Sequence, residues 1–232
     1  MNSFSVRRSI YSASTIIFFF IVAGFACPVF AQTKNAPVLT GEKTGYALGV
    51  GIGRNMKNLE LDIDADMIAR GVRDAARGQI AMSDQEIKAA LDNYDREVMT
   101  KLGQKNRREG EAFLRENKQR KVVQTLPSGL QYWVLKEGKG RIPKMTDTVV
   151  LQYQARLLDG YEFENSRWHN RPTEIAVNKT MKGWSEALTM MPEGSLWRLY
   201  IPPELAYGEG GAGQIIGPNA VLICDVELVS VK

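Results

Sequence analysis

The spacing of apolar residues changes near residue 125, and that change divides the chain into two kinds of structure. Before it, apolar residues recur every three or four positions, as on one face of an α-helix. After it, apolar and polar residues alternate, as in antiparallel strands that bury one face. A helical region therefore precedes a sheet, and the predicted fold class is α+β.

Three glycines in the helical region, Gly45, Gly49 and Gly53, lie four residues apart. Helical residues at this spacing share one face, so these glycines form a face without side chains. Each helical Gly costs about 1 kcal/mol relative to Ala, a cost that close packing against a second helix would offset. The segment does not match the nucleotide-binding pattern GxGxxG, and no Gly-Lys-Ser/Thr follows it.

Capping residues mark two further helices. Asp64 precedes an apolar stripe that ends at Gly78, which predicts an N-cap and a C-cap. Residues 83–86 form a Ser-x-x-Glu capping box, and helix-compatible residues continue to about 121, with no apolar face between 103 and 111. This predicts one long helix with a solvated middle. At ~1.5 Å per residue it would span roughly 58 Å, so it must project from any domain of this size.

The C-terminal region contains alternating segments and one short helix. Alternation runs through 130–134, 149–157 and 222–228, and a further strand at 196–201 is stopped by two prolines. A helix is expected over 183–191, before Pro192. The predicted architecture is a twisted antiparallel sheet folded over a single short helix.

The first 31 residues have the order of a signal peptide. Arg7 and Arg8 precede an apolar run of eleven residues, 16–26, which is too short to span a bilayer, since that needs about 20. Small residues then predict cleavage before Gln32 and export of the chain. Lipid attachment at Cys27 is the alternative, and it fits the preceding residues less well.

The charge and the ligand inventory exclude several classes of function. The 30 Lys and Arg residues are nearly balanced by 26 Asp and Glu residues, which argues against nucleic acid as a partner. Two Cys and one His cannot form a closed zinc site, which needs about four ligands, so we expect no metal. A His-based triad would rest on His169 alone. After cleavage only Cys224 is left, and no intrachain disulfide can form.

Five separated motifs in the C-terminal region resemble those of FKBP-type peptidyl-prolyl isomerases, in the same order. They are LLDGYEFENS (157–166), MKGWSEAL (181–188), IPPELAYG (201–208), IIGPN (215–219) and DVEL (225–228). The helical part is similar to the N-terminal region of the Mip/FkpA branch of that family, through YALG (46–49), LDIDAD (61–66), GEAFL (110–114) and LPSGLQY (126–132).

The resemblance implies an exported bacterial isomerase and chaperone, placed in the periplasm or at the outer-membrane surface. It implies proline-containing polypeptides as substrates, no cofactor, possible macrolide inhibitors and a homodimer formed by N-terminal helices. The implied organisation is a signal peptide (1–31), a helical dimerisation region (32–82), a long linking helix (83–123) and an FKBP-like isomerase domain (124–232).

The resemblance also assigns the site residue by residue. It implies that Trp184 floors a proline pocket, that the Met181 N–H and the Tyr207 hydroxyl donate to substrate carbonyls, and that Glu164 stands where the family usually has Asp. The predicted catalytic residues are Tyr153, Phe163, Glu164, Trp184 and Tyr207. The predicted substrate-binding residues are Thr180, Met181, Ile216 and Cys224.

Such a site needs neither a nucleophile nor a metal. Rotation about a peptide bond has a barrier of about 18–20 kcal/mol, whereas cis and trans X-Pro differ by only about 0.5–1 kcal/mol. A twisted amide has a smaller dipole than a planar one. Transfer into a dry aromatic pocket therefore costs the twisted form less free energy than the planar form. Shortening a ~100 s step to ~10 ms requires about 5.4 kcal/mol.

Some positions depart from the family pattern and leave a second hypothesis open. Glu164 is longer than the usual Asp, Cys224 and Ile175 replace aromatic residues, and Thr180 replaces a usual Val. The pocket should therefore be roomier and less aromatic, with weaker macrolide binding. The alternative function is a weakly catalytic or non-catalytic chaperone or binding module.

Overall fold

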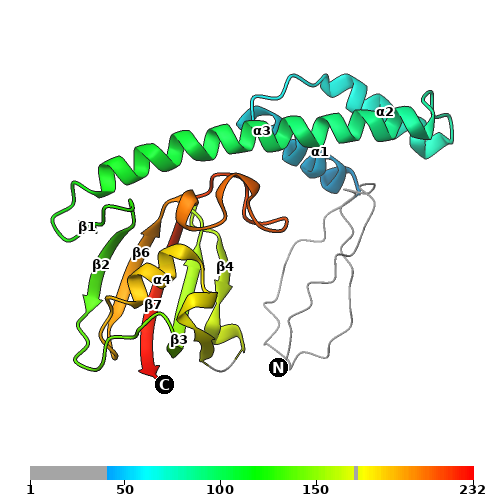
Figure 1. Cartoon of the computed structure of the whole chain (residues 1–232). Coiled ribbons are helices and arrows are strands. Elements are labelled where there is room, and N and C mark those ends of the chain that lie inside the picture. Colours follow the sequence, from blue (N-terminus) through cyan, green and yellow to red (C-terminus); the bar gives the residue numbers. More distant parts are fainter. Residues whose placement is uncertain (1–40, 170–171) are drawn as a thin grey trace. The chain divides into compact units, whose positions relative to one another are not determined.

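The computed structural model describes residues 41–169 and 172–232 (Figure 1). The chain divides into two compact units, one ending at Val98 and the other beginning at Met99. The expected signal peptide, residues 1–31, and Cys27 within it lie outside the described residues. No helix in the described part of the chain is both long and apolar enough to cross a membrane.

The first unit consists of helices. α1 spans Gly41–Asn58, α2 spans Ala65–Arg77, and the N-terminal part of α3 (Asp84–Asn117) completes it. A Cβ added at Gly45, Gly49 or Gly53 would meet nothing within 4 Å. Large apolar side chains of this unit are also exposed; examples are Tyr46, Leu48, Ile52, Met67, Val72 and Leu91.

The predicted helix caps are confirmed. The Asp64 side chain accepts hydrogen bonds from the backbone N–H groups of Asp66 (2.8 Å) and Met67 (3.3 Å), and Gly78 ends α2 with φ +68°. The Ser83 N–H donates to Glu86 Oε2 (2.8 Å), while the Glu86 N–H donates to Ser83 Oγ (3.3 Å). These bonds stabilise the charged carboxylate, so they lower the pKa of Glu86.

The second unit is built on an antiparallel sheet of seven strands. Hydrogen bonding orders them β1-β2-β6-β7-β3-β4, and β5 also pairs with β3. The alternating segments of the sequence form β2, β3, β6 and β7, as predicted. The strands are β1 Gln124–Thr125, β2 Gln131–Lys136, β3 Thr148–Arg156, β4 Glu162–Asn165, β5 Thr173–Ala176, β6 Leu196–Ile201 and β7 Leu222–Val231.

Helix α4 (Lys182–Leu188) lies across one face of this sheet (Figure 1). Its Trp184, Ala187 and Leu188 join the inward-facing strand residues in one hydrophobic core, in which Leu151 and Leu199 have no exposed surface. Short 3₁₀ turns complete the unit; they are η1 Ser166–His169, η2 Val177–Lys179, η3 Pro203–Leu205 and η4 Gly208–Gly210.

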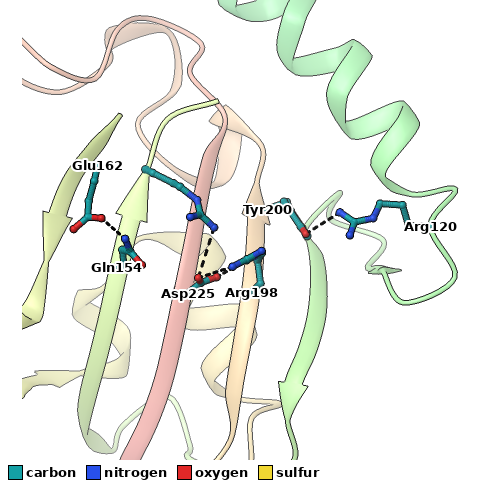
Figure 2. Close-up of polar contacts among 7 residues, drawn as sticks. Arg120, Gln154, Glu162, Arg198, Tyr200 and Asp225 are labelled. Carbon is teal, nitrogen blue, oxygen red and sulfur yellow. Dashed lines mark hydrogen bonds and ion pairs between the residues drawn. The ribbon is translucent and has the colours of Figure 1, made fainter. Parts of the chain in front are cut away.

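The opposite face of the sheet carries polar residues that join neighbouring strands (Figure 2). Arg198 on β6 binds Asp225 on β7 with two hydrogen bonds, of 2.5 and 2.7 Å, and Arg156 on β3 lies 3.6 Å from the same carboxylate. Gln154 on β3 donates to Glu162 on β4. The alternation predicted from sequence thus separates an apolar inner face from a polar outer face.

The expected solvated middle of the long helix is wrong. Gly103 and Gly110 of α3 are buried, and a Cβ at Gly110 would stand 2.8 Å from Val221 Cγ2. The apolar pattern disappears here because glycines let this part of the helix, which belongs to the second unit, approach Pro218 and Val221 directly. The helix ends at Asn117, before the expected 121, where the buried Asn117 amide donates to Gln131 Oε1 at 2.8 Å.

Substituting Gly110 by Ala should destabilise the second unit by about 1–3 kcal/mol, because overpacking at Val221 outweighs the gain in helix propensity. All four tryptophans follow residue 99, so denaturant unfolding followed by tryptophan fluorescence reports on this unit. Val221→Ala should cost less in the Gly110→Ala background than in the wild type. Equal costs in both backgrounds would contradict the contact.

Candidate functional site

Two aromatic rings from different elements meet on the inner face of the sheet. Tyr153 projects inward from β3, and Trp184 lies in the first turn of α4, where its N–H donates to Met181 O at 3.0 Å. The ring centroids are 4.8 Å apart and the planes cross at 73°, an edge-to-face contact. Trp184 is 7% exposed. It therefore lies almost wholly beneath the surface, and its role as the floor of a pocket stays a prediction.

Cys224 supports this pair from β7. The strand register places Cys224 opposite Ala155, next to the pairing of Val226 with Tyr153. Cys224 has no exposed surface, and burial raises the pKa of its thiol to about 12, which the nearby Trp184 indole opposes only in part. The thiol is therefore protonated at neutral pH and does not act as a nucleophile. Its predicted contact with substrate stays a prediction.

The Glu164 carboxylate lies close enough to Tyr153 and Tyr207 to raise the pKa of both hydroxyls. Burial raises the pKa of the Tyr153 hydroxyl, a hydrogen bond with Thr173 opposes this shift, and the negative charge of Glu164 raises the pKa further. Burial likewise raises the pKa of Tyr207, with smaller contributions from Cys224 and Glu164. Both hydroxyls are therefore protonated, and able to donate, at neutral pH. Tyr207 is 42% exposed, so its hydroxyl belongs to the rim.

The remaining predicted residues surround the same core. Ile216 is buried, and Phe163 and Met181 are partly buried against the cluster that contains Trp184. Thr180 has a local structural role as well, because its hydroxyl donates to Val177 O at 2.8 Å and lies 2.9 Å from Ser185 Oγ. It thus fixes the chain at the start of α4.

Two further residues interact with Tyr153 and were not among the predicted site residues. The buried Ser166 accepts a hydrogen bond from the Tyr153 N–H (2.9 Å) and donates to Tyr153 O (3.3 Å). Thr173 on β5 hydrogen-bonds the Tyr153 side chain. Ser166 closes the motif at 157–166, but neither the motif nor the periodicity gives Ser166 or Thr173 a partner, so the structure identifies both as partners of Tyr153.

The site contains hydrogen-bond donors and aromatic surfaces rather than reactive groups. The Trp184 Nε1–H meets no nitrogen or oxygen acceptor among the described residues. Across residues 41–169 and 172–232, no three His, Cys, Asp or Glu residues are grouped so that they could hold a metal ion. The arrangement can enclose an apolar ring and offer hydrogen bonds to nearby carbonyls.

Family models match almost the whole described chain. Residues 41–134 match the domain amino-terminal to FKBP-type peptidyl-prolyl isomerase, and residues 139–229 match the FKBP-type peptidyl-prolyl cis-trans isomerase domain.

Curated relatives and a solved structure agree with this assignment. The chain is 35% identical to "Outer membrane protein MIP" of Legionella longbeachae, over 91% of this chain and 95% of that protein. It is 36% identical to peptidyl-prolyl cis-trans isomerase Mip of Coxiella burnetii, over 82% of this chain and 86% of that protein. The crystal structure of FkpA from Escherichia coli matches with a TM-score of 0.61 and 36% identity, over 83% of this chain and 97% of that one.

Motifs, fold and relatives thus agree along both units, and the chain belongs to the FKBP-type peptidyl-prolyl cis-trans isomerases, in the branch that contains Mip and FkpA.

Proposed function

We propose that the chain catalyses X-Pro isomerisation by holding a twisted amide against the Tyr153–Trp184 pair. The observation that carries this proposal is the edge-to-face contact at 4.8 Å, with Tyr207 and Glu164 beside it. The proline ring occupies the apolar surface over Trp184. Phe163, Ile216 and Met181 close the sides of the pocket, and Thr180 fixes the start of α4.

The free energy by which these residues must stabilise the twisted amide relative to the planar one is modest. An acceleration of ~10⁴-fold corresponds to about 5.4 kcal/mol of differential stabilisation. Excluding water from the planar, more polar amide contributes part of it. Hydrogen bonds from the Tyr207 hydroxyl and the Met181 N–H contribute about 1 kcal/mol each. Glu164 adds a negative charge near the rotating carbonyl, one methylene further from its backbone than the family's Asp.

We further propose that the chain is exported and acts as a homodimer. In this proposal residues 1–31 are a signal peptide, 32–82 dimerise, 83–123 form the linking helix and 124–232 are the isomerase domain. Support comes from the open glycine face of α1 and the exposed apolar residues of the first unit. A relative named as an outer membrane protein supports the location.

A weakly catalytic chaperone is the second candidate. Cys224 is fully buried where the family usually has an aromatic wall residue, which leaves one wall of the site without a ring. This observation favours weak macrolide binding as well. Suppression of client aggregation without any isomerase activity would favour the chaperone over the enzyme.

Removing the Tyr207 hydroxyl, in Tyr207→Phe, should lower kcat/KM about three- to tenfold, because one hydrogen bond to the twisted amide is lost. Trp184→Ala should lower it by more than about tenfold, since it removes the floor. A protease-free assay on an Ala-Pro peptide measures both. Tyr161→Ala is the matched control, because the Tyr161 side chain is 55% exposed. Wild-type rates in both site variants would mean that the pocket is misassigned.

The rate should not fall as pH rises from 7 towards the ordinary tyrosine pKa of 10.0. Burial raises the pKa of Tyr207, so the hydroxyl stays protonated over this range and continues to donate. The pH profile of kcat/KM measures this. A decline with a midpoint well below 10, absent from Tyr207→Phe, would show that the hydroxyl ionises early.

Deleting residues 32–82 from the cleaved chain should convert a dimer into a monomer, because it removes the glycine face and most of the exposed large apolar side chains of the first unit. Multi-angle light scattering measures the mass of both proteins. A monomeric cleaved chain, or a shortened chain that is still dimeric, would contradict this assignment of the dimer interface.

A further inference from the structure

One loop carries two of the predicted site residues and contains little regular structure. Residues 207–219, here called the site loop, begin at Tyr207 and include Ile216. Within it Ala212 and Ile216 exchange backbone hydrogen bonds of 2.7 and 3.1 Å, and the Asn219 N–H donates to Gly208 O at 2.9 Å. These bonds give the loop its shape, but they do not fix it to the sheet.

Helix α3 holds the end of this loop through a reciprocal pair of asparagines. The Asn106 side-chain amide donates to Pro218 O at 2.8 Å. In return, the Asn219 side-chain amide donates to Gly103 O at 3.3 Å. Asn219 has φ +56°, a left-handed conformation that Asn tolerates better than most residues. The loop is therefore bonded to the helix in both directions.

Close packing reinforces the two hydrogen bonds. A Cβ at Gly217 would lie 2.8 Å from Leu102 Cδ2 and 3.1 Å from Asn106 Nδ2, and a Cβ at Gly103 would lie 3.1 Å from Pro218 Cβ. Glycines on both sides thus bring the backbones of loop and helix together. Arg107 also pairs with Glu209 at 2.7 Å, but this pair is exposed and contributes little.

The helix is itself anchored to the sheet beyond these contacts. Gln131 of β2 accepts from the Asn117 amide and donates to Leu114 O, both at 2.8 Å. Phe113 packs against Tyr200 of β6 with ring centroids 5.7 Å apart, and Arg120 donates to the Tyr200 hydroxyl (Figure 2). The C-terminal half of α3 therefore connects the site loop to the strands.

We propose that Asn106 is a positioning residue for the isomerase, acting through the site loop on Ile216 and Tyr207. The inference rests on the proposed function of the pocket. Releasing Pro218 lets the loop leave the position in which Ile216 is buried in the same core as Trp184 and Tyr207 lies close enough to Tyr153 to raise its pKa. If fewer molecules have the loop in its binding-competent conformation, the apparent affinity for substrate falls in proportion. The effect therefore falls mainly on KM.

Asn106→Ala should lower kcat/KM about three- to tenfold, the range expected for one lost hydrogen bond, with most of the change in KM. Gln104→Ala is the matched control, since Gln104 is exposed two residues earlier on the same helix. The peptide assay is run on the full cleaved chain without denaturant. The temperature is one at which tryptophan fluorescence shows that both variants are folded.

A double-mutant cycle separates positioning from a general loss of stability. Ile216→Ala alone should lower activity, and Asn106→Ala should add little in the Ile216→Ala background, because the two act through one loop. Full additivity would overturn the proposal. So would an Asn106→Ala variant within twofold of the wild type, or a loss confined to kcat.

Amide hydrogen exchange at Ile216 gives a readout that does not depend on activity. The Ile216 N–H is bonded to Ala212 O within the loop, and it should exchange faster in Asn106→Ala than in the wild type or Gln104→Ala. A wild type without isomerase activity would reject the proposed function but not the link between Asn106 and the loop. Unchanged exchange at Ile216 would reject the positioning role whether or not the wild type is active.

Discussion

The edge-to-face contact between Tyr153 and Trp184 is the interaction on which the site depends. It joins strand β3 to helix α4, which lies across the inner face of the sheet (Figure 1). Cys224 and the core leucines belong to the same buried cluster as Trp184, against which Tyr153 packs. Because protein cores are close-packed, packing holds the orientation of the indole, whose Nε1–H meets no nitrogen or oxygen acceptor within the part of the chain that the structure describes.

A site of this kind suits a reaction whose barrier is rotational. The described part of the chain offers protonated tyrosines, a buried thiol with a pKa raised to about 12 and an aromatic floor. None of these is a strong nucleophile at neutral pH. Preorganised hydrogen-bond donors in a water-poor site lower the energy of the twisted amide relative to the planar one. The shortage of His and Cys in the sequence is consistent with such chemistry.

Local signals in the sequence predicted much of the fold. The caps at Asp64 and Ser83 and the alternation in β3 and β7 rest on short-range physics, and the structure confirms them. The strands β4 and β5 were missed, since both are four residues long and only partly buried. The covered face of α3 was missed because its contacts use Gly103, Gly110 and Asn117 rather than large apolar residues.

The site was predictable only in part. Periodicity places Tyr153 on an inward strand face and Trp184 on a short helix, but it says nothing about their meeting. The ordered motifs supplied that grouping through family resemblance. Ser166, Thr173 and Asn106 act through polar contacts with residues distant in sequence, and the identity of a single polar residue does not indicate which distant partner it binds.

The central claim is that this pocket speeds rotation about an X-Pro bond without transferring a proton or forming a covalent bond. The most direct test is the isomerisation rate of a proline peptide with the wild-type chain in H₂O and in D₂O. The account predicts a large acceleration over the spontaneous rate and a solvent isotope ratio near one. No acceleration, or an isotope ratio of about two or more, as expected for rate-limiting proton transfer, would contradict it.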